Sequence, residues 1–150
     1  MQNNTEKYYN ITKNIQPHLN VQKFLDYKLP PQKAIDIGCG AGRDTVALIK
    51  KNWEVLAIDK ENTKPIIMES LNEEEQSRLE FLNCTFGNMK LPKASLVVAN
   101  FSLPFSRKDY FNLIWKKIED AIIENGYFVG NFFGKKDSWI NIKKDLVFLT

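Results

Sequence analysis

The sequence is poor in cysteine and histidine. Its 150 residues include two cysteines, Cys39 and Cys84, and one histidine, His18. The cysteine spacing suits neither a metal site nor a disulfide framework, so we expect no bound metal and a reducing compartment such as the cytoplasm. No apolar run of about 18 residues and no charged-then-apolar leader occurs, so we expect a soluble protein without a membrane partner.

An excess of charge of either sign is also missing. Lys and Arg number 21 against 18 Asp and Glu, which gives a net charge of +3. The lysines are scattered as pairs such as Lys50-Lys51 and Lys116-Lys117, a pattern typical of solvated helix faces. Nucleic-acid binding needs a contiguous basic face interleaved with aromatic residues, so this class of partner is disfavoured.

Glycine is scarce, with seven in the chain, yet three of them lie in one short segment. Gly38, Gly40 and Gly42 alternate after the apolar run that contains Asp36, and a helix-forming segment follows. Glycine lets a ligand approach the main chain closely, and a helix start offers unpaired N–H groups. The last glycine of a G-x-G-x-x-G dinucleotide fingerprint would fall at position 43, where the chain has Arg43.

A second strand is predicted over residues 54–59, and it ends in Asp59, 21 positions after Gly38. In a doubly wound fold the first two strands are neighbours, so this carboxylate is placed to accept hydrogen bonds from ribose hydroxyls. The two segments together predict a nucleotide-like ligand.

The pattern D-x-G-x-G-x-G resembles motif I of the class I S-adenosylmethionine-dependent methyltransferases, and the resemblance runs from about Ile35 to the end of the chain. The G-R-D-T continuation and the later N-F-F-G are similar to the small-molecule tellurite-resistance and thiopurine type. The resemblance implies S-adenosylmethionine as cofactor, held by Asp36, Gly38, Cys39, Gly40, Gly42, Arg43, Asp59, Lys60, Thr85, Phe86 and Asn100. Arg43 would pair with a carboxylate, or equally point into solvent.

The resemblance also implies where substrate residues lie. Asn100 and Asn131 follow the fourth and fifth predicted strands, and Tyr9 comes from the N-terminal segment. Both asparagines have a turn-forming role as the alternative. His18 is either a general base or a surface or capping residue, and Asp44 is expected to stabilise a helix N-terminus.

Apolar strand-like segments alternate with helical ones, which predicts an α/β fold. We expect one domain over residues 1–150, with a helical cap segment at 1–30 and a cofactor-binding core at 31–150. The family implies a Rossmann-like, three-layer sheet with strand order 3-2-1-4-5. Residues Ser106 to Asp109 resemble a capping box, which is expected to start a helix, and Gly126 is expected to end that helix. The expected strands are an apolar run ending near Ile37, then 54–59, 79–84, 95–101 and 127–132, with helices from Leu19, Arg43 and Pro65.

The family has two further strands that we expect this sequence to lack, and residues 145–150 resemble the connection to them. The fifth strand would then expose an edge. Either the sequence is a fragment of a longer protein or another chain covers this edge, and self-association through the edge is the expectation for the chain alone. The leading hypothesis is methyl transfer to a small soluble acceptor by in-line displacement, where a thiolate needs no protein base and an alcohol does. The alternatives are a non-catalytic S-adenosylmethionine-binding or interaction module and a nicotinamide-dependent oxidoreductase.

Overall fold

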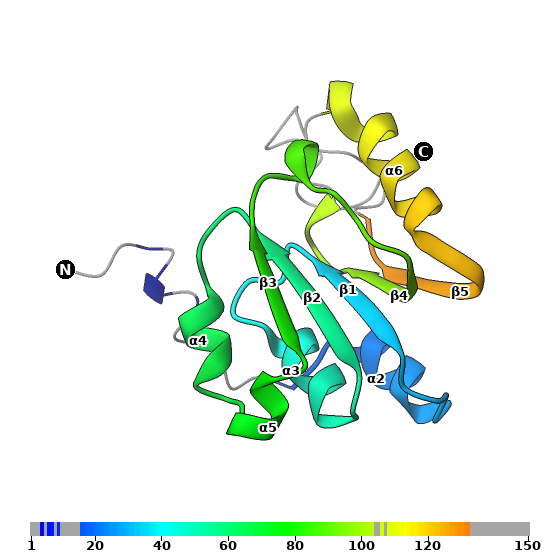
Figure 1. Cartoon of the computed structure of the whole chain (residues 1–150). Coiled ribbons are helices and arrows are strands. Elements are labelled where there is room, and N and C mark those ends of the chain that lie inside the picture. Colours follow the sequence, from blue (N-terminus) through cyan, green and yellow to red (C-terminus); the bar gives the residue numbers. More distant parts are fainter. Residues whose placement is uncertain are drawn as a thin grey trace.

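The computed structural model describes residues 16–103, 106 and 108–132, together with residues 4, 6, 7 and 9. Five strands in this part of the chain form one parallel sheet in the order β3-β2-β1-β4-β5, which confirms the predicted topology (Figure 1). The strands are β1 Lys33–Ile37, β2 Glu54–Asp59, β3 Leu79–Asn83, β4 Ala94–Ala99 and β5 Ile122–Gly130. The helices are α2 Leu19–Asp26, α3 Arg43–Lys50, α4 Lys64–Met68, α5 Glu73–Gln76 and α6 Phe111–Ala121, with short 3-10 turns η1 Phe86–Asn88 and η3 Lys108–Tyr110.

Strand β1 lies at the centre of the sheet, between β2 and β4. The chain winds outward from β1 to β3 on one side and from β4 to β5 on the other, so the direction of winding changes beside β1. Parallel strands bring their carboxyl ends to one edge, and ligands of such sheets bind where the winding reverses. The loops after β1, β2 and β4 therefore converge on one place.

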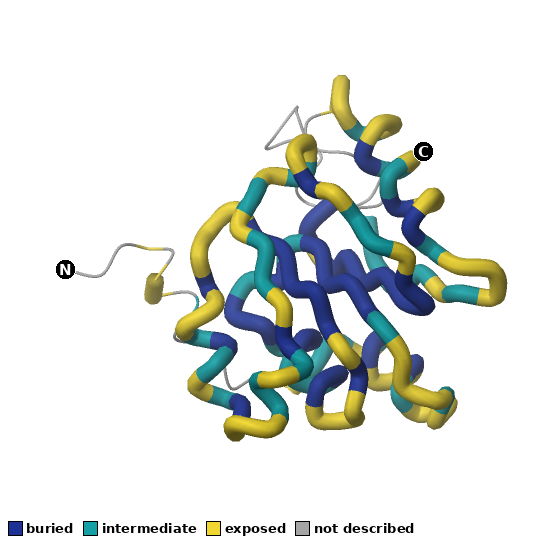
Figure 2. Tube along the Cα trace, viewed as in Figure 1, coloured by how far each residue is buried: buried dark blue, intermediate teal, exposed yellow. Residues whose placement is uncertain are grey.

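The sheet is covered on both faces. Alternate residues of β1 belong to different hydrophobic clusters, Ala34 to one and Ile35 and Ile37 to the other. Helices α2, α3 and α4 cover the first cluster and α6 covers the second, which gives three layers (Figure 1). The central strands are consequently the most deeply buried segments (Figure 2). Burial on both faces explains why these strands are continuous apolar runs.

The helix before β5 differs from the prediction at both ends. It begins at Phe111 after η3, and the Ser106 hydroxyl donates to the carbonyl of Leu103, so the predicted capping box is wrong. It ends at Ala121, and Gly126 lies inside β5. The register of β5 shifts by an irregularity opposite Ala94 to Leu96, which allows pairing to resume at Tyr127, where the sequence had placed the strand start.

Elsewhere the differences are small. Strands β3 and β4 end one and two residues before the predicted ends. The helix predicted from Pro65 is α4, and the short helix α5 after it was not predicted. Asn72 and Glu75 form a capping box that starts α5.

Among the described residues β5 pairs only with β4, and self-association through its other edge stays a prediction. The predicted connection at 145–150 lies outside the described residues.

Candidate functional site

A cavity of about 1090 Å³ opens at the carboxyl edge of the sheet. Its walls come from the loops after β1, β2, β3 and β4, from the start of α6, and from His18 and Tyr9 before the sheet. Of the residues predicted to bind the cofactor, all but Gly42 line this cavity. Of the three predicted catalytic residues, Asn100 and Tyr9 line it and Asn131 does not.

The glycine loop after β1 has the backbone conformation that its sequence predicts. Gly38, Gly40 and Gly42 have φ values of +70°, +53° and +85°, in the region that favours glycine. The N–H groups of Gly38 and Cys39 both donate to the carbonyl of Ile58, at 2.8 and 3.0 Å. These bonds tie the loop to the end of β2, and they hold its backbone along the cavity.

The three glycines meet different surroundings. A Cβ on Gly38 would lie 2.4 Å from the Cβ of Ser102, and one on Gly42 would lie 2.6 Å from Ile67. A Cβ on Gly40 would meet only the ring of Tyr9, at 3.6 Å. The first and third glycines are therefore required by packing inside the protein, whereas the second keeps the cavity itself open.

Asp59 ends β2 and is held by two main-chain groups. Gly40 N–H donates to its Oδ2 and Glu61 N–H donates to its Oδ1, each at 2.9 Å. The side chain is buried, and Asp59 and the exposed Lys60 beside it line the cavity. Each carboxylate oxygen has a second lone pair, so Asp59 can accept further hydrogen bonds from a ligand.

Asp36 is a buried carboxylate beneath the glycine loop. The hydroxyl of Thr45 donates to its Oδ2 at 2.6 Å. Burial, and then the negative charges of Asp44 and Asp59, raise the pKa of Asp36 to about 8. Burial, and then the charges of Asp36 and Asp59, raise the pKa of the Cys39 thiol well above its usual range, so Cys39 is not a ready nucleophile.

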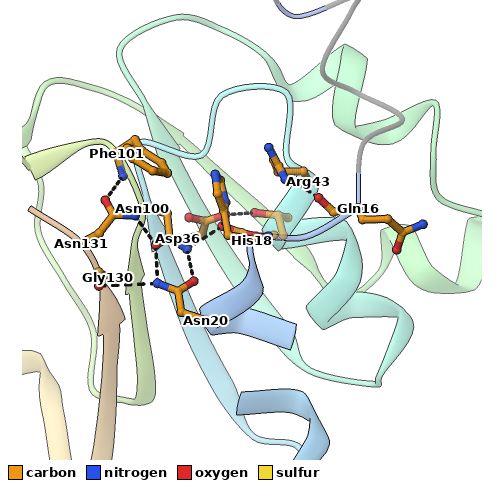
Figure 3. A network of polar contacts seen from close by, with 11 residues as sticks. Gln16, His18, Asn20, Asp36, Arg43, Asn100, Phe101, Gly130 and Asn131 are labelled. Carbon is orange, nitrogen blue, oxygen red and sulfur yellow. Dashed lines mark hydrogen bonds and ion pairs between the residues drawn. The ribbon is translucent and has the colours of Figure 1, made fainter. Parts of the chain in front are cut away.

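A polar network joins α2, α3 and the ends of β4 and β5 (Figure 3). Asn20 and Asn100 exchange two side-chain hydrogen bonds, at 2.7 and 2.9 Å. Asn100 Nδ2 also donates to Asp44 Oδ2 at 3.0 Å, and Asn100 Oδ1 accepts from Asn131 Nδ2 at 3.1 Å. Both donors and both acceptor positions of the Asn100 amide are thus engaged by protein groups. Asn100 joins neighbouring elements while it lines the cavity.

Asp44 is the buried anion of this network. Its Oδ1 accepts from the main-chain N–H of His18 at 2.8 Å, and its Oδ2 lies 2.7 Å from His18 Nδ1. Burial alone would raise the pKa of Asp44, but the hydrogen bonds from His18 and Asn100 outweigh it and hold that pKa below its ordinary value. Asp44 thus links α3 to the chain just before α2, a role that goes beyond stabilising a helix start.

Phe101 follows Asn100 and has a strained backbone, with φ of +52°. Asn131 Oδ1 accepts from its N–H at 2.6 Å, which helps to hold this conformation. The ring of Phe101 packs against the imidazole of His18 with 5.3 Å between centroids. Asn131 therefore does not line the cavity itself, but it forms hydrogen bonds with Phe101 and Asn100, which do.

Thr85 and Phe86, two of the residues predicted to hold the cofactor, form another part of the cavity wall. Ser102 Oγ is buried beside this wall and has no hydrogen-bond partner among the described residues. Arg43 Nε donates to the carbonyl of Gln16 at 2.8 Å, which ties Arg43 to the segment before α2. Arg43 also lines the cavity.

Sequence reasoning missed Asn20 and Ser102. The signal for Asn20 is an amide near the start of a helix, which gives no hint of a partner 80 positions away. Within the described residues no group of three or more His, Cys, Asp or Glu side chains is arranged to hold a metal ion. None of the helices described there is both long and apolar enough to cross a membrane.

The sequence was compared with known families and proteins. A family model described as a methyltransferase domain matches residues 34–126. A carboxy-S-adenosyl-L-methionine synthase from Nautilia profundicola is 27% identical over 114 residues, covering 75% of this chain and 49% of that protein. The enzyme of the same name from Shewanella pealeana is 26% identical over 112 residues, covering 69% and 45%. The chain spans about half the length of the curated relatives it matches.

Solved structures show the same architecture. TehB from Haemophilus influenzae matches with a TM-score of 0.69 and 20% identity, over 87% of this chain and 47% of that one. A 1,6-didemethyltoxoflavin-N1-methyltransferase from Burkholderia thailandensis, solved with its toxoflavin ligand and S-adenosylhomocysteine, matches with a TM-score of 0.68 and 18% identity, over 81% and 53%. At these identities the likeness establishes the fold alone.

Proposed function

We propose that this chain, which belongs to the methyltransferase domain family, binds S-adenosylmethionine and transfers its methyl group to a small soluble acceptor. The observation that carries the proposal is the hydrogen bond between the glycine loop, at Gly40, and Asp59, both of which line the cavity. A loop open at Gly40 and an acid at the end of β2 match the methionine and ribose parts of this cofactor.

The charges around the cavity support the same cofactor. S-adenosylmethionine carries a sulfonium and an ammonium, and the acidic side chains of Asp44 and Asp59 line the cavity. Opposite charges at short range stabilise one another more strongly in a partly buried site than in water. Arg43 and Lys60 both line the cavity, and of these two cations Arg43 follows the glycine loop and is proposed to pair with the cofactor's carboxylate.

The unpaired hydroxyl of Ser102 and the ring of Phe86 are also suited to S-adenosylmethionine. A buried hydroxyl without a partner is costly, and a polar ligand atom would satisfy it. Phe86 lines the same cavity, and an adenine ring would pack against its side chain. The roles of Thr85, Lys60 and Cys39 in holding the cofactor remain part of the proposal.

When bound, the cofactor supplies a methyl group activated by the positive sulfur. The chain's task is then to hold donor and acceptor in line and to keep water out. Tyr9 and Asn100 line the cavity, and Asn131 accepts a hydrogen bond from the main-chain N–H of Phe101. We infer that Asn100 and Asn131 act by positioning neighbouring groups, since their amides bond to protein atoms.

Methyl transfer to thiophenol tests the proposed function, because its thiolate needs no protein base. The predicted result is S-methyl thiophenol formed at a rate that saturates with S-adenosylmethionine. Binding of the cofactor without transfer to any small acceptor would instead favour the non-catalytic binding module. The proposed self-association through β5 is measured on the same sample by sedimentation.

A further inference from the structure

We infer that His18 and Asp44 form a general-base pair, and that the acceptor is a neutral molecule with a hydroxyl group on an aromatic or apolar body. The inference rests on the proposed function and names its acceptor class. His18 lies at the cavity wall, immediately before α2, and its side chain is 22% exposed.

The contact between the two side chains decides which ring nitrogen is basic. His18 Nδ1 lies 2.7 Å from Asp44 Oδ2. An ionised carboxylate can only accept hydrogen bonds, so in the neutral imidazole the proton is on Nδ1 and the lone pair is on Nε2. Among the described residues no hydrogen bond engages Nε2, which leaves this nitrogen for a ligand in the cavity.

Two groups, Asp44 and Phe101, fix the orientation of the imidazole. Asp44 is itself held by the main-chain N–H of His18 and by Asn100 Nδ2, so it cannot turn away from the ring. The ring of Phe101 packs against the imidazole, and the strained backbone of Phe101 is held by Asn131. A base that is oriented by a buried carboxylate and an aromatic wall is preorganised for proton transfer.

The cavity that His18 lines also has apolar groups in its wall, and one of them, Phe101, contacts His18. Phe101, Tyr110 and Leu113 are each about half exposed, at 53%, 46% and 52%, and all three line the cavity. Exposed aromatic and aliphatic side chains that gather at a cavity mouth are typical of a binding surface for an apolar ligand. A phenol fits this combination, with its ring on the apolar wall and its hydroxyl at Nε2.

The acceptor oxygen attacks the methyl carbon, the O–C bond forms, and the carbon–sulfur bond breaks with its electron pair passing to sulfur. The acceptor proton moves to His18 Nε2, and the resulting imidazolium is stabilised by Asp44 until it loses the proton to solvent. The products are the methyl ether and S-adenosylhomocysteine.

The His18→Asn variant isolates the base, because its amide can still donate to Asp44 while Nε2 is removed. With phenol as acceptor, the variant should lose about 100-fold or more in turnover, the usual contribution of a general base. With thiophenol, which is largely ionised at neutral pH, its turnover should change by less than about threefold by the same reasoning. Lys23→Ala, an exposed change on α2, is the matched control and should leave both rates unchanged.

The single histidine offers a readout independent of turnover. Ring ¹⁵N resonances of His18 should show Nδ1 protonated and Nε2 bare, and adding phenol to the protein with S-adenosylhomocysteine should shift the Nε2 signal. A proton on Nε2, or an Nε2 signal that saturating phenol leaves unmoved, would overturn the inference. Phenol methylation unchanged by His18→Asn would do the same while leaving the proposed function intact. Failure to bind S-adenosylmethionine would overturn the proposed function instead.

Discussion

The main-chain N–H of Gly40 donates a 2.9 Å hydrogen bond to Oδ2 of Asp59, so the loop after β1 and the acid that ends β2 are directly joined. Both residues line the cavity. The bond gives Asp59 two tasks, to shape the loop and to accept hydrogen bonds from a bound ribose.

Removing the Asp59 carboxylate should therefore weaken cofactor binding. Asp59→Ala deletes acceptors for ribose hydroxyls, and hydrogen bonds to a charged group contribute about 1.5 to 3 kcal/mol each. The dissociation constant of S-adenosylhomocysteine, measured by calorimetry, should rise by about tenfold or more. Asp59→Asn, which keeps one oxygen acceptor, should lose less. An unchanged constant in a folded Asp59→Ala protein would place the ribose elsewhere.

Substitution of Gly40 should impair cofactor binding, whereas substitution of Gly42 should impair stability. Gly40→Val puts a branched side chain into the cavity, so it should abolish cofactor binding while helix content stays near the native value. Gly42→Ala forces a Cβ to within 2.6 Å of Ile67, at a φ of +85°, so it should lower the melting temperature. Circular dichroism and calorimetry on both variants separate the two effects. Normal binding by Gly40→Val would show that the loop does not hold the cofactor.

The buried carboxyl of Asp36 should make stability depend on pH. Its pKa is raised to about 8, so between about pH 4 and pH 8 the folded state holds a proton that the unfolded state has lost. This contribution to stability is complete at low pH and is lost as the pH rises through that window. Asp36→Asn should flatten the decline, and above pH 8 it should raise the free energy of unfolding by at least about 1 kcal/mol. Parallel urea titrations of both proteins check this slope, and identical slopes would contradict it.

Asn131 should influence turnover more than cofactor affinity. Asn131→Ala removes the acceptor that holds the Phe101 N–H, and Phe101 packs on His18. Loss of one such hydrogen bond should lower turnover by about threefold to tenfold. The dissociation constant of the cofactor should stay within about twofold, since Asn131 does not line the cavity. Equal losses in both quantities would make Asn131 a purely structural residue.

The sequence predicted the elements whose signals are local. The alternating glycines require positive φ, and a helix start follows them at Arg43 as expected. Strand β2 has the predicted bounds, because a buried apolar run that ends in a polar residue is unambiguous. These features depend on neighbours within a few positions, so reading along the chain is sufficient to find them.

The contacts between distant segments could not be predicted in this way. The amides of Asn20 and Asn100 are paired across 80 positions, and Asp44 contacts His18 across 26. The helix end at Ala121 is likewise set by tertiary structure, because residues 122–130 form the strand beside β4 although Gly126 offers an ordinary helix stop. Residue types alone do not reveal which polar groups the fold brings together.

Calorimetric titration with S-adenosylhomocysteine and with NAD tests the central claim most directly. The open glycine loop, the acid at the end of β2 and the absence of a third glycine at position 43 all predict binding of S-adenosylhomocysteine with a stoichiometry of about one. NAD should give no measurable heat under the same conditions. Binding of NAD without binding of S-adenosylhomocysteine would contradict the account.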